Sequence, residues 1–215
     1  ELSQPDQQTI YLMDRPGSSQ VELMLGHLGI SGSSPERRVL GVANRVLGGS
    51  SSARLFQNLR EEKGYTYGVY SSFSFPRNLG RFAVSAAVGN EVVAPALEEI
   101  LYEIETLRSE PAPQDEREAV KSNIIGSYAL SLETLLDFVR QIVSLESRGL
   151  TVDELNTYLD VIAAVTAEDV QAISQRYLLP DQLVIVTVGD ASQIRDDLEA
   201  IAPVVLIDDE GRIIE

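Results

Sequence analysis

Hydrophobic residues alternate with polar ones in several short segments of the chain and recur at helical spacing in the longer segments between them. The alternation is clearest in residues 20–28, where Val21, Leu23 and Leu25 occupy every second position. A period of two places alternate side chains on opposite faces of a strand, so this segment predicts a strand with one buried face. Residues 9–14 predict a shorter strand, and the turn-forming residues between the two segments favour their antiparallel pairing.

Further strand signals lie later in the chain. Residues 69–75 and 81–88 are joined by residues 76–80, whose Pro, Asn and Gly predict the turn of a hairpin. Residues 182–188 are mostly apolar, which favours a central strand. After a short helix, residues 204–207 are expected to form the last strand.

The longer segments place hydrophobic residues three and four positions apart, which predicts amphipathic helices. We expect Ser51 or Ser52 to cap the second of these helices, and the fourth to bend near Gly126 or Ser131. The predicted helices are residues 35–47, 52–63, 92–107, 114–147, 151–165 and 167–177.

Strands that occur in pairs, separated by blocks of helices, are typical of the α+β class. We therefore predict a largely antiparallel sheet with helices packed on one face. Residues 9–208 are expected to form this single α+β domain, with residues 1–8 as a polar linker and residues 209–215 as a tail.

The net charge excludes one class of partner. The 215 residues include 33 acidic and 17 basic side chains, a formal net charge of −16. Nucleic acid requires a basic face whose counterions can be displaced, so we expect no nucleic-acid partner.

The longest apolar run, residues 183–188, is far shorter than the roughly 20 residues of a membrane helix, and no membrane partner is expected. Cysteine is absent, which leaves the redox compartment of the protein open.

His27 is the single histidine of the chain. Common catalytic zinc sites use two or three histidines, or cysteines with histidine, and this sequence can supply neither set. We therefore expect no metal site on this chain and interpret His27 as a strand-end side chain or a contact to a partner. The acidic residues of the third helix lie mainly off its apolar stripe and predict a solvated face: Glu98, Glu99, Glu103 and Glu105.

Gly48 and Gly49 precede three serines at a predicted helix start, where free backbone N–H groups could hold an anion. No lysine followed by serine or threonine completes a phosphate-binding loop. We therefore favour a capped helix turn.

Arg60 and Tyr67 are the strongest candidates for a binding function. Arg60 falls in the last turn of a predicted helix that Gly64 ends, and Tyr67 opens the next strand, so chain reversal can direct both side chains into one cleft. A guanidinium donates to peptide carbonyls, and a phenol can donate to an oxyanion that develops on a carbonyl. Alternatively, Arg60 complements the helix dipole and pairs with Glu61 or Glu62, while Tyr67 is a core aromatic residue.

Four segments together resemble one protein family. The segments are Ile10-Tyr11-Leu12-Met13-Asp14-Arg15-Pro16-Gly17, Gly26-His27, Gly48-Gly49-Ser50-Ser51-Ser52-Ala53-Arg54-Leu55 and Leu59-Arg60-Glu61-Glu62-Lys63-Gly64-Tyr65-Thr66-Tyr67. Over about residues 10–190 the chain resembles the C-terminal half of bacterial zinc proteases of the pitrilysin/insulinase family, which is related to mitochondrial processing peptidases.

This resemblance implies a half-clamshell domain of a metallopeptidase. In the family, two homologous α+β halves close over a chamber; the N-terminal half carries an inverted zinc motif, His-x-x-Glu-His with a later Glu, and the C-terminal half supplies an Arg and a Tyr seven residues apart. By resemblance Arg60 and Tyr67 would bind the peptide substrate, and zinc would be bound by an N-terminal half or a separate catalytic subunit. The chain alone would carry no catalytic residue and would be inactive.

Two other functions stay open at this point. The chain could be a catalytically inactive scaffold subunit of the same fold, or a peptide-binding module that adds extended segments to its sheet edge. The acidity could line a chamber that attracts basic peptides, or reflect general surface adaptation. We favour the second explanation, because nothing in the sequence places the carboxylates on one wall.

Overall fold

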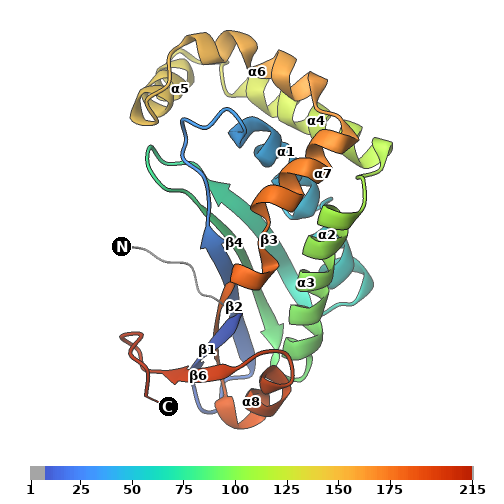
Figure 1. The fold of residues 1–215 in the computed structure, drawn as a ribbon, viewed down its shortest axis with the longest axis vertical. Helices are drawn as coiled ribbons and strands as arrows, with labels where there is room; N and C mark the ends of the chain where they lie inside the picture. Colours follow the sequence, from blue (N-terminus) through green and yellow to red (C-terminus); the bar gives the residue numbers. More distant parts are fainter. Residues whose placement is uncertain (1–7, 215) are drawn as a thin grey trace.

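The computed structural model describes residues 8–214, which form a six-stranded sheet ordered β3-β4-β2-β5-β1-β6 (Figure 1). Alternate residues of each long strand are buried, as in β2, where Val21, Leu23 and Leu25 are buried while Met24 is 58% exposed. The strands are β1 (Thr9–Asp14), β2 (Gln20–Leu28), β3 (Thr66–Ser74), β4 (Arg81–Gly89), β5 (Val184–Gly189) and β6 (Val204–Ile207).

The strand pairing is largely antiparallel, as predicted. β3 pairs with β4, β4 with β2 and β2 with β5 in antiparallel register, whereas β1 is parallel to both β5 and β6. The predicted hairpin of residues 69–75 and 81–88 is confirmed as β3–β4, and the predicted closing strand is the interior strand β5.

The predicted pairing of β1 with β2 is wrong, because β5 lies between them. The turn after β1 is held by the end of β5 instead of closing a hairpin. The Arg15 N–H donates to the Gly189 carbonyl at 2.6 Å, and the Gly17 N–H donates to Asp190 at 2.9 Å. A strand from the far end of the chain thus fills the position that local pairing would have occupied.

The helices cover one face of the sheet, which confirms the predicted α+β arrangement (Figure 1). Their apolar stripes and the inward residues of the strands form one continuous core. The helices are α1 (Arg37–Leu47), α2 (Arg54–Phe56), η1 (Gln57–Glu62), η2 (Asn90–Val92), α3 (Val93–Ser109), α4 (Gln114–Leu130), α5 (Leu135–Ser147), α6 (Asp153–Ala164), α7 (Ala167–Tyr177), η3 (Pro180–Gln182) and α8 (Ala191–Glu199).

Two helix predictions need correction. The segment predicted as one bent helix over residues 114–147 is two helices, α4 and α5, separated by residues 131–134. The Thr134 hydroxyl caps α5 by accepting from the Asp137 N–H at 3.1 Å. The expected Ser51 or Ser52 cap is wrong: α2 begins after Ala53, and no side chain caps it.

The glycines before α2 serve close packing. A Cβ on Gly48 would lie 2.7 Å from the Ser71 backbone nitrogen and 2.8 Å from a Leu55 methyl, and one on Gly49 would lie 2.7 Å from the Arg45 Cα. This loop therefore lies directly against β3 and α1, which explains the glycine pair without an anion.

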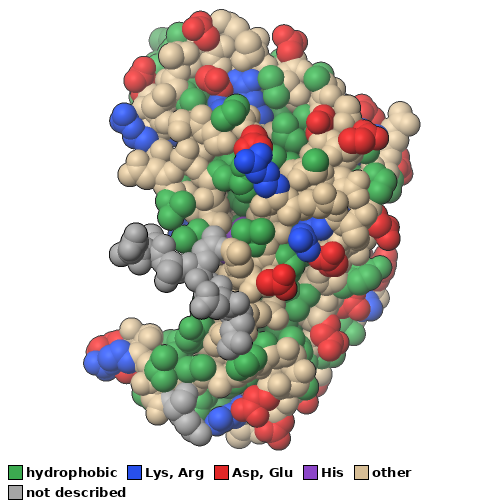
Figure 2. All heavy atoms as spheres, viewed as in Figure 1, with side chains coloured by type: hydrophobic (Ala, Val, Ile, Leu, Met, Phe, Trp, Pro, Cys, Tyr) green, Lys and Arg blue, Asp and Glu red, His purple; other side chains and the backbone are tan. Residues whose placement is uncertain are grey.

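The ends of the chain and its surface complete the fold. The predicted linker, residues 1–8, lies outside the described residues except for Gln8. At the other end, residues after β6 turn back, and the Ile214 N–H donates to the Leu206 carbonyl at 2.9 Å. No helix among residues 8–214 is long and apolar enough to cross a bilayer. Acidic side chains are scattered over the face shown in Figure 2.

Candidate functional site

Arg60 lies on a widened helical turn, the π-helix η1, that follows directly from α2. The Lys63 N–H donates to the Asn58 carbonyl at 3.0 Å, five residues back, and the Tyr65 N–H donates to the Leu59 carbonyl at 2.8 Å. Gly64 then adopts a φ of +68°, a left-handed conformation that glycine accepts without strain. The helix therefore ends where predicted, and π-turns of this kind are frequent at functional sites.

The structure brings Arg60 and Tyr67 together. The Arg60 guanidinium carbon lies 5.5 Å from the centre of the Tyr67 ring, a cation–π arrangement. Tyr67 is 84% exposed, so it is not a core aromatic residue, and that alternative is wrong. Within residues 8–214 Arg60 forms no ion pair with Glu61 or Glu62, and the Tyr67 hydroxyl has no protein partner. Their polar atoms are thus available to a ligand.

A small open pocket of about 260 Å³ adjoins this pair. Its walls come from the ends of three strands that lie far apart in the sequence: the start of β2, the start of β3 and the end of β4. The lining residues are Gln20, Arg60, Gly64, Tyr65, Thr66, Tyr67, Ala87, Val88 and Gly89. The guanidinium and the phenol therefore lie at the rim of a cavity, as a ligand-binding role requires.

A β-bulge sets the direction of Tyr67. The register between β3 and β4 shifts between Thr66 and Val69. The Thr66 hydroxyl donates to the Ala87 carbonyl at 2.6 Å and accepts from the Gly68 N–H at 3.1 Å, so it holds the irregular backbone in place. Bulges often redirect a side chain next to a functional site, and this one lies directly at Tyr67.

Asn58 anchors the same turn to α3. It is 8% exposed, and its amide donates to Glu99 at 2.9 Å and to Glu103 at 2.8 Å. Lys63, at the end of η1, pairs with Glu99 at 2.6 Å. The predicted solvated face is therefore wrong for Glu99 and Glu103, because both carboxylates bind the turn that carries Arg60.

The environment of these carboxylates changes their acidity in opposite directions. Hydrogen bonds from Lys63 and Asn58 lower the pKa of Glu99. Burial raises the pKa of Glu103, and the Asn58 amide partly opposes that rise. The pairing partners of Asn58 could not be found from sequence, because they lie about 40 residues away on another helix.

The sheet face turned away from the helices extends from the pocket as a nearly uncharged surface. Tyr11, Met24, Ser85 and Val186 lie opposite one another in register across four strands, and Met24 is 58% exposed. Ala87 lines the pocket and lies two residues after Ser85 in β4, so both side chains point to the same outward face of the sheet. Such a surface can contact the apolar side chains of an extended peptide.

His27 is a buried strand-end side chain rather than part of this site. Its Nδ1 lies 2.8 Å from the Leu28 carbonyl, its Nε2 accepts from the Leu179 N–H at 3.3 Å, and its ring packs on Phe82 with centroids 5.0 Å apart. These contacts fit a neutral ring protonated on Nδ1. Burial lowers the pKa of His27.

The residues of this chain do not fit a zinc site. Within the described part of the chain, no three His, Cys, Asp or Glu side chains are grouped so that they could hold a metal ion. The sequence itself offers one histidine and no cysteine. The imidazole and thiolate ligands that zinc prefers would have to come from another chain or another part of the protein.

Residues 1–124, more than half of the chain, match the family described as the peptidase M16 inactive domain. The chain belongs to the peptidase M16 family.

Curated relatives that the chain matches are longer proteins. It is 35% identical to YmxG, an uncharacterised zinc protease of Bacillus subtilis, over 133 residues that make up 62% of this chain and 32% of that protein. The chain thus spans about a third of the length of this curated relative.

Solved structures share the fold of this chain. An M16 inactive domain structure from Pseudomonas fluorescens matches with a TM-score of 0.81 and 28% identity over 87% of this chain and 45% of that one. The inactive peptidase domain of a zinc protease from Bordetella parapertussis shares the fold, with a TM-score of 0.68 and 17% identity over 80% of this chain and 94% of that one.

Proposed function

We propose that this M16 inactive domain is the substrate-binding half of a zinc endopeptidase, which acts when it closes against a half or subunit that carries the inverted zinc motif. The observation that carries the proposal is the contact between half-buried Arg60 and exposed Tyr67 beside an open pocket. Family membership supports the type of enzyme, since YmxG is named a zinc protease.

The two side chains have distinct roles in this proposal. Arg60 can donate to peptide carbonyls through its planar guanidinium, and its stacking on the Tyr67 ring fixes the position of both groups. The Tyr67 hydroxyl can then donate to the oxyanion that develops on the scissile carbonyl. The zinc half supplies the water activation, and this chain supplies orientation and charge stabilisation.

The surrounding structure supports an extended peptide as the ligand. The outward face of the sheet beside the pocket is nearly uncharged, and Glu22 and Arg81 are the charged residues in the outward positions of β2 and β4. Peptide binding would therefore depend on backbone contacts and apolar side chains more than on basic residues of the substrate. This favours general surface adaptation as the reason for the acidity of the chain.

The test is steady-state kinetics of the enzyme reassembled with its zinc half. Tyr67→Phe should lower kcat by roughly 10²-fold, as loss of an oxyanion donor does elsewhere, with little change in KM. Arg60→Gln should mainly raise KM, because it removes binding that the substrate and the transition state share.

Tyr70→Phe is the matched control, because Tyr70 lies three residues along the same strand, is 47% exposed, and is not part of the pocket. Equal activity of wild type, Tyr67→Phe and Tyr70→Phe would refute the proposed role of Tyr67. Peptidase activity of a preparation that contains no protein with the zinc motif would refute the division of labour between the halves.

A further inference from the structure

A second and larger cavity lies away from Arg60 and Tyr67, between α1 and the group formed by α4, α5 and α6. Its volume is about 350 Å³, within the range of small-molecule sites. Figure 1 shows α4, α5 and α6 grouped beyond α1 at one end of the molecule. The cavity shares no lining residue with the pocket beside Tyr67.

The cavity gathers positive charge in a strongly acidic chain. Arg37, Arg38, Arg45 and Arg148 line it together with one acidic residue, Glu154, so its lining carries a net charge of +3 while the whole chain carries −16. Guanidinium groups gathered in this way repel one another, so an anion among them would stabilise the arrangement.

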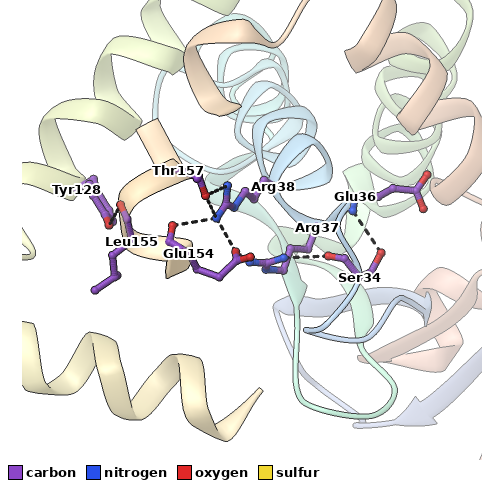
Figure 3. Close-up of polar contacts among 8 residues, drawn as sticks. All are labelled: Ser34, Glu36, Arg37, Arg38, Tyr128, Glu154, Leu155 and Thr157. Carbon is purple, nitrogen blue, oxygen red and sulfur yellow. Dashed lines mark hydrogen bonds and ion pairs between the residues drawn. The ribbon is translucent and has the colours of Figure 1, made fainter. Parts of the chain in front are cut away.

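Glu154 accounts for part of this charge. It pairs with both Arg37 and Arg38, and Arg38 also donates to the Glu154 backbone carbonyl at 2.9 Å and to the Thr157 hydroxyl at 3.2 Å (Figure 3). These contacts tie α1 to α6. Arg38 is nevertheless not fully satisfied, since its Nε is buried and has no hydrogen-bond partner in the structure.

Arg45 and Arg148 have only neutral partners among residues 8–214. Arg45 donates to the Asn123 side chain at 3.5 Å, and Arg148 donates to the Ser144 hydroxyl at 2.9 Å. Both side chains are half-buried, so water screens their charges less than at an open surface. The tie between the helices does not involve them, which leaves two guanidinium groups without a structural counter-charge.

Aromatic and aliphatic side chains complete the cavity. The rings of Tyr128 and Tyr158 stack with centroids 4.5 Å apart. Burial raises the pKa of Tyr158, and the fields of Arg45, Arg38, Arg37 and Arg148 partly oppose that rise, so all four guanidiniums act on one hydroxyl. The aliphatic part of the lining comes from Val42, Ile124, Leu145, Leu155 and Ile162.

We propose that this cavity binds a small dianionic ligand with an apolar or aromatic body, held through Arg45 and Arg148. A guanidinium forms paired hydrogen bonds with a phosphate or carboxylate, and the tyrosine and aliphatic wall accommodates the body of such a ligand. The excess charge of the lining favours a doubly charged group over a single carboxylate.

Phenyl phosphate is a suitable probe, because it combines a dianion with an aromatic ring. Isothermal titration calorimetry on the full chain at pH 7.5 should show saturable binding with a Kd of about 1 mM or tighter. Inorganic phosphate should bind about tenfold more weakly, since it lacks the apolar body. The double variant Arg45→Gln/Arg148→Gln should weaken phenyl phosphate binding by about tenfold or more.

Arg140→Gln is the matched control, because Arg140 lies on α5, its side chain is 69% exposed, and it is not part of the cavity. This variant removes the same kind of charge and should bind phenyl phosphate with the same affinity as wild type. Circular dichroism checks that the double variant is folded; if it is not, the single variant Arg148→Gln replaces it, with a smaller expected loss. Absence of saturable binding, or equal binding by the cavity and control variants, would overturn the proposal.

Discussion

Substitution of Asn58 by Ala tests whether the turn that carries Arg60 depends on its anchor to α3. The variant removes two hydrogen bonds, at 2.9 and 2.8 Å, from an amide that is 8% exposed to two carboxylates. A hydrogen bond to a charged group contributes about 1.5–3 kcal/mol. Glu99 keeps Lys63 as a partner, whereas Glu103 loses its donor from η1, so we expect a loss of roughly 3 kcal/mol in the free energy of unfolding at pH 8.

The loss should depend on pH, because burial has already raised the pKa of Glu103. Removal of the Asn58 donor raises that pKa further, and the carboxylate is then the costly form in the folded state. A raised folded pKa of an acid destabilises the protein as pH rises through it, since the folded state holds the proton that the unfolded state releases. The cost of Asn58→Ala should therefore be smaller at pH 5, by roughly 1 kcal/mol, than at pH 8.

Urea denaturation of wild type and variant at both pH values measures these differences. Gln57→Ala is the control, because Gln57 is an exposed amide of the same turn that donates to the Ser51 carbonyl at 2.8 Å and contacts no carboxylate. Its cost should be below about 1 kcal/mol and the same at both pH values. A cost for Asn58→Ala as small as that of the control, or one that does not change with pH, would refute the anchoring role.

Three further predictions concern stability. Burial lowers the pKa of His27, so as pH falls the unfolded chain protonates this imidazole before the folded protein does. The free energy of unfolding of wild type should therefore fall relative to that of His27→Gln as pH drops through about 6.5. Parallel curves of stability against pH for the two proteins would contradict this. Gly48→Ala should cost about 1–3 kcal/mol, since its Cβ would meet Ser71 backbone at 2.7 Å, whereas Gly126→Ala, with open space around it, should not destabilise. Thr166→Ala should cost about 1 kcal/mol because it removes the capping box of α7, and Thr166→Ser should restore most of it.

The sequence predicted those parts of the fold that local patterns determine. Alternation in residues 20–28 and helical spacing in α3 placed the correct faces inward, and Gly64 marked the end of the turn that carries Arg60. The partner of β1 could not be predicted in this way, because β5 lies some 170 residues further along the chain and no local signal favours its insertion between β1 and β2.

The candidate site also has one part that local sequence patterns predict and another part that depends on tertiary contacts. Arg60 and Tyr67 are seven residues apart on either side of one chain reversal, so their proximity followed from local structure. Asn58 and the arginine-lined cavity required tertiary contacts. A partial signal existed, since Arg37, Arg38 and Arg45 recur seven and eight residues apart and hence on one face of α1, but their acidic partner lies on α6.

The most direct test of the proposed substrate-binding role is a crystal structure of this domain assembled with the proposed zinc-binding half, in which the glutamate of the His-x-x-Glu-His motif is mutated to trap a peptide. We expect an extended peptide along the outward face of the sheet, with one backbone carbonyl within about 3 Å of the Tyr67 hydroxyl and a second backbone carbonyl accepting a hydrogen bond from Arg60. A peptide bound elsewhere, with both side chains out of hydrogen-bond reach, would contradict it.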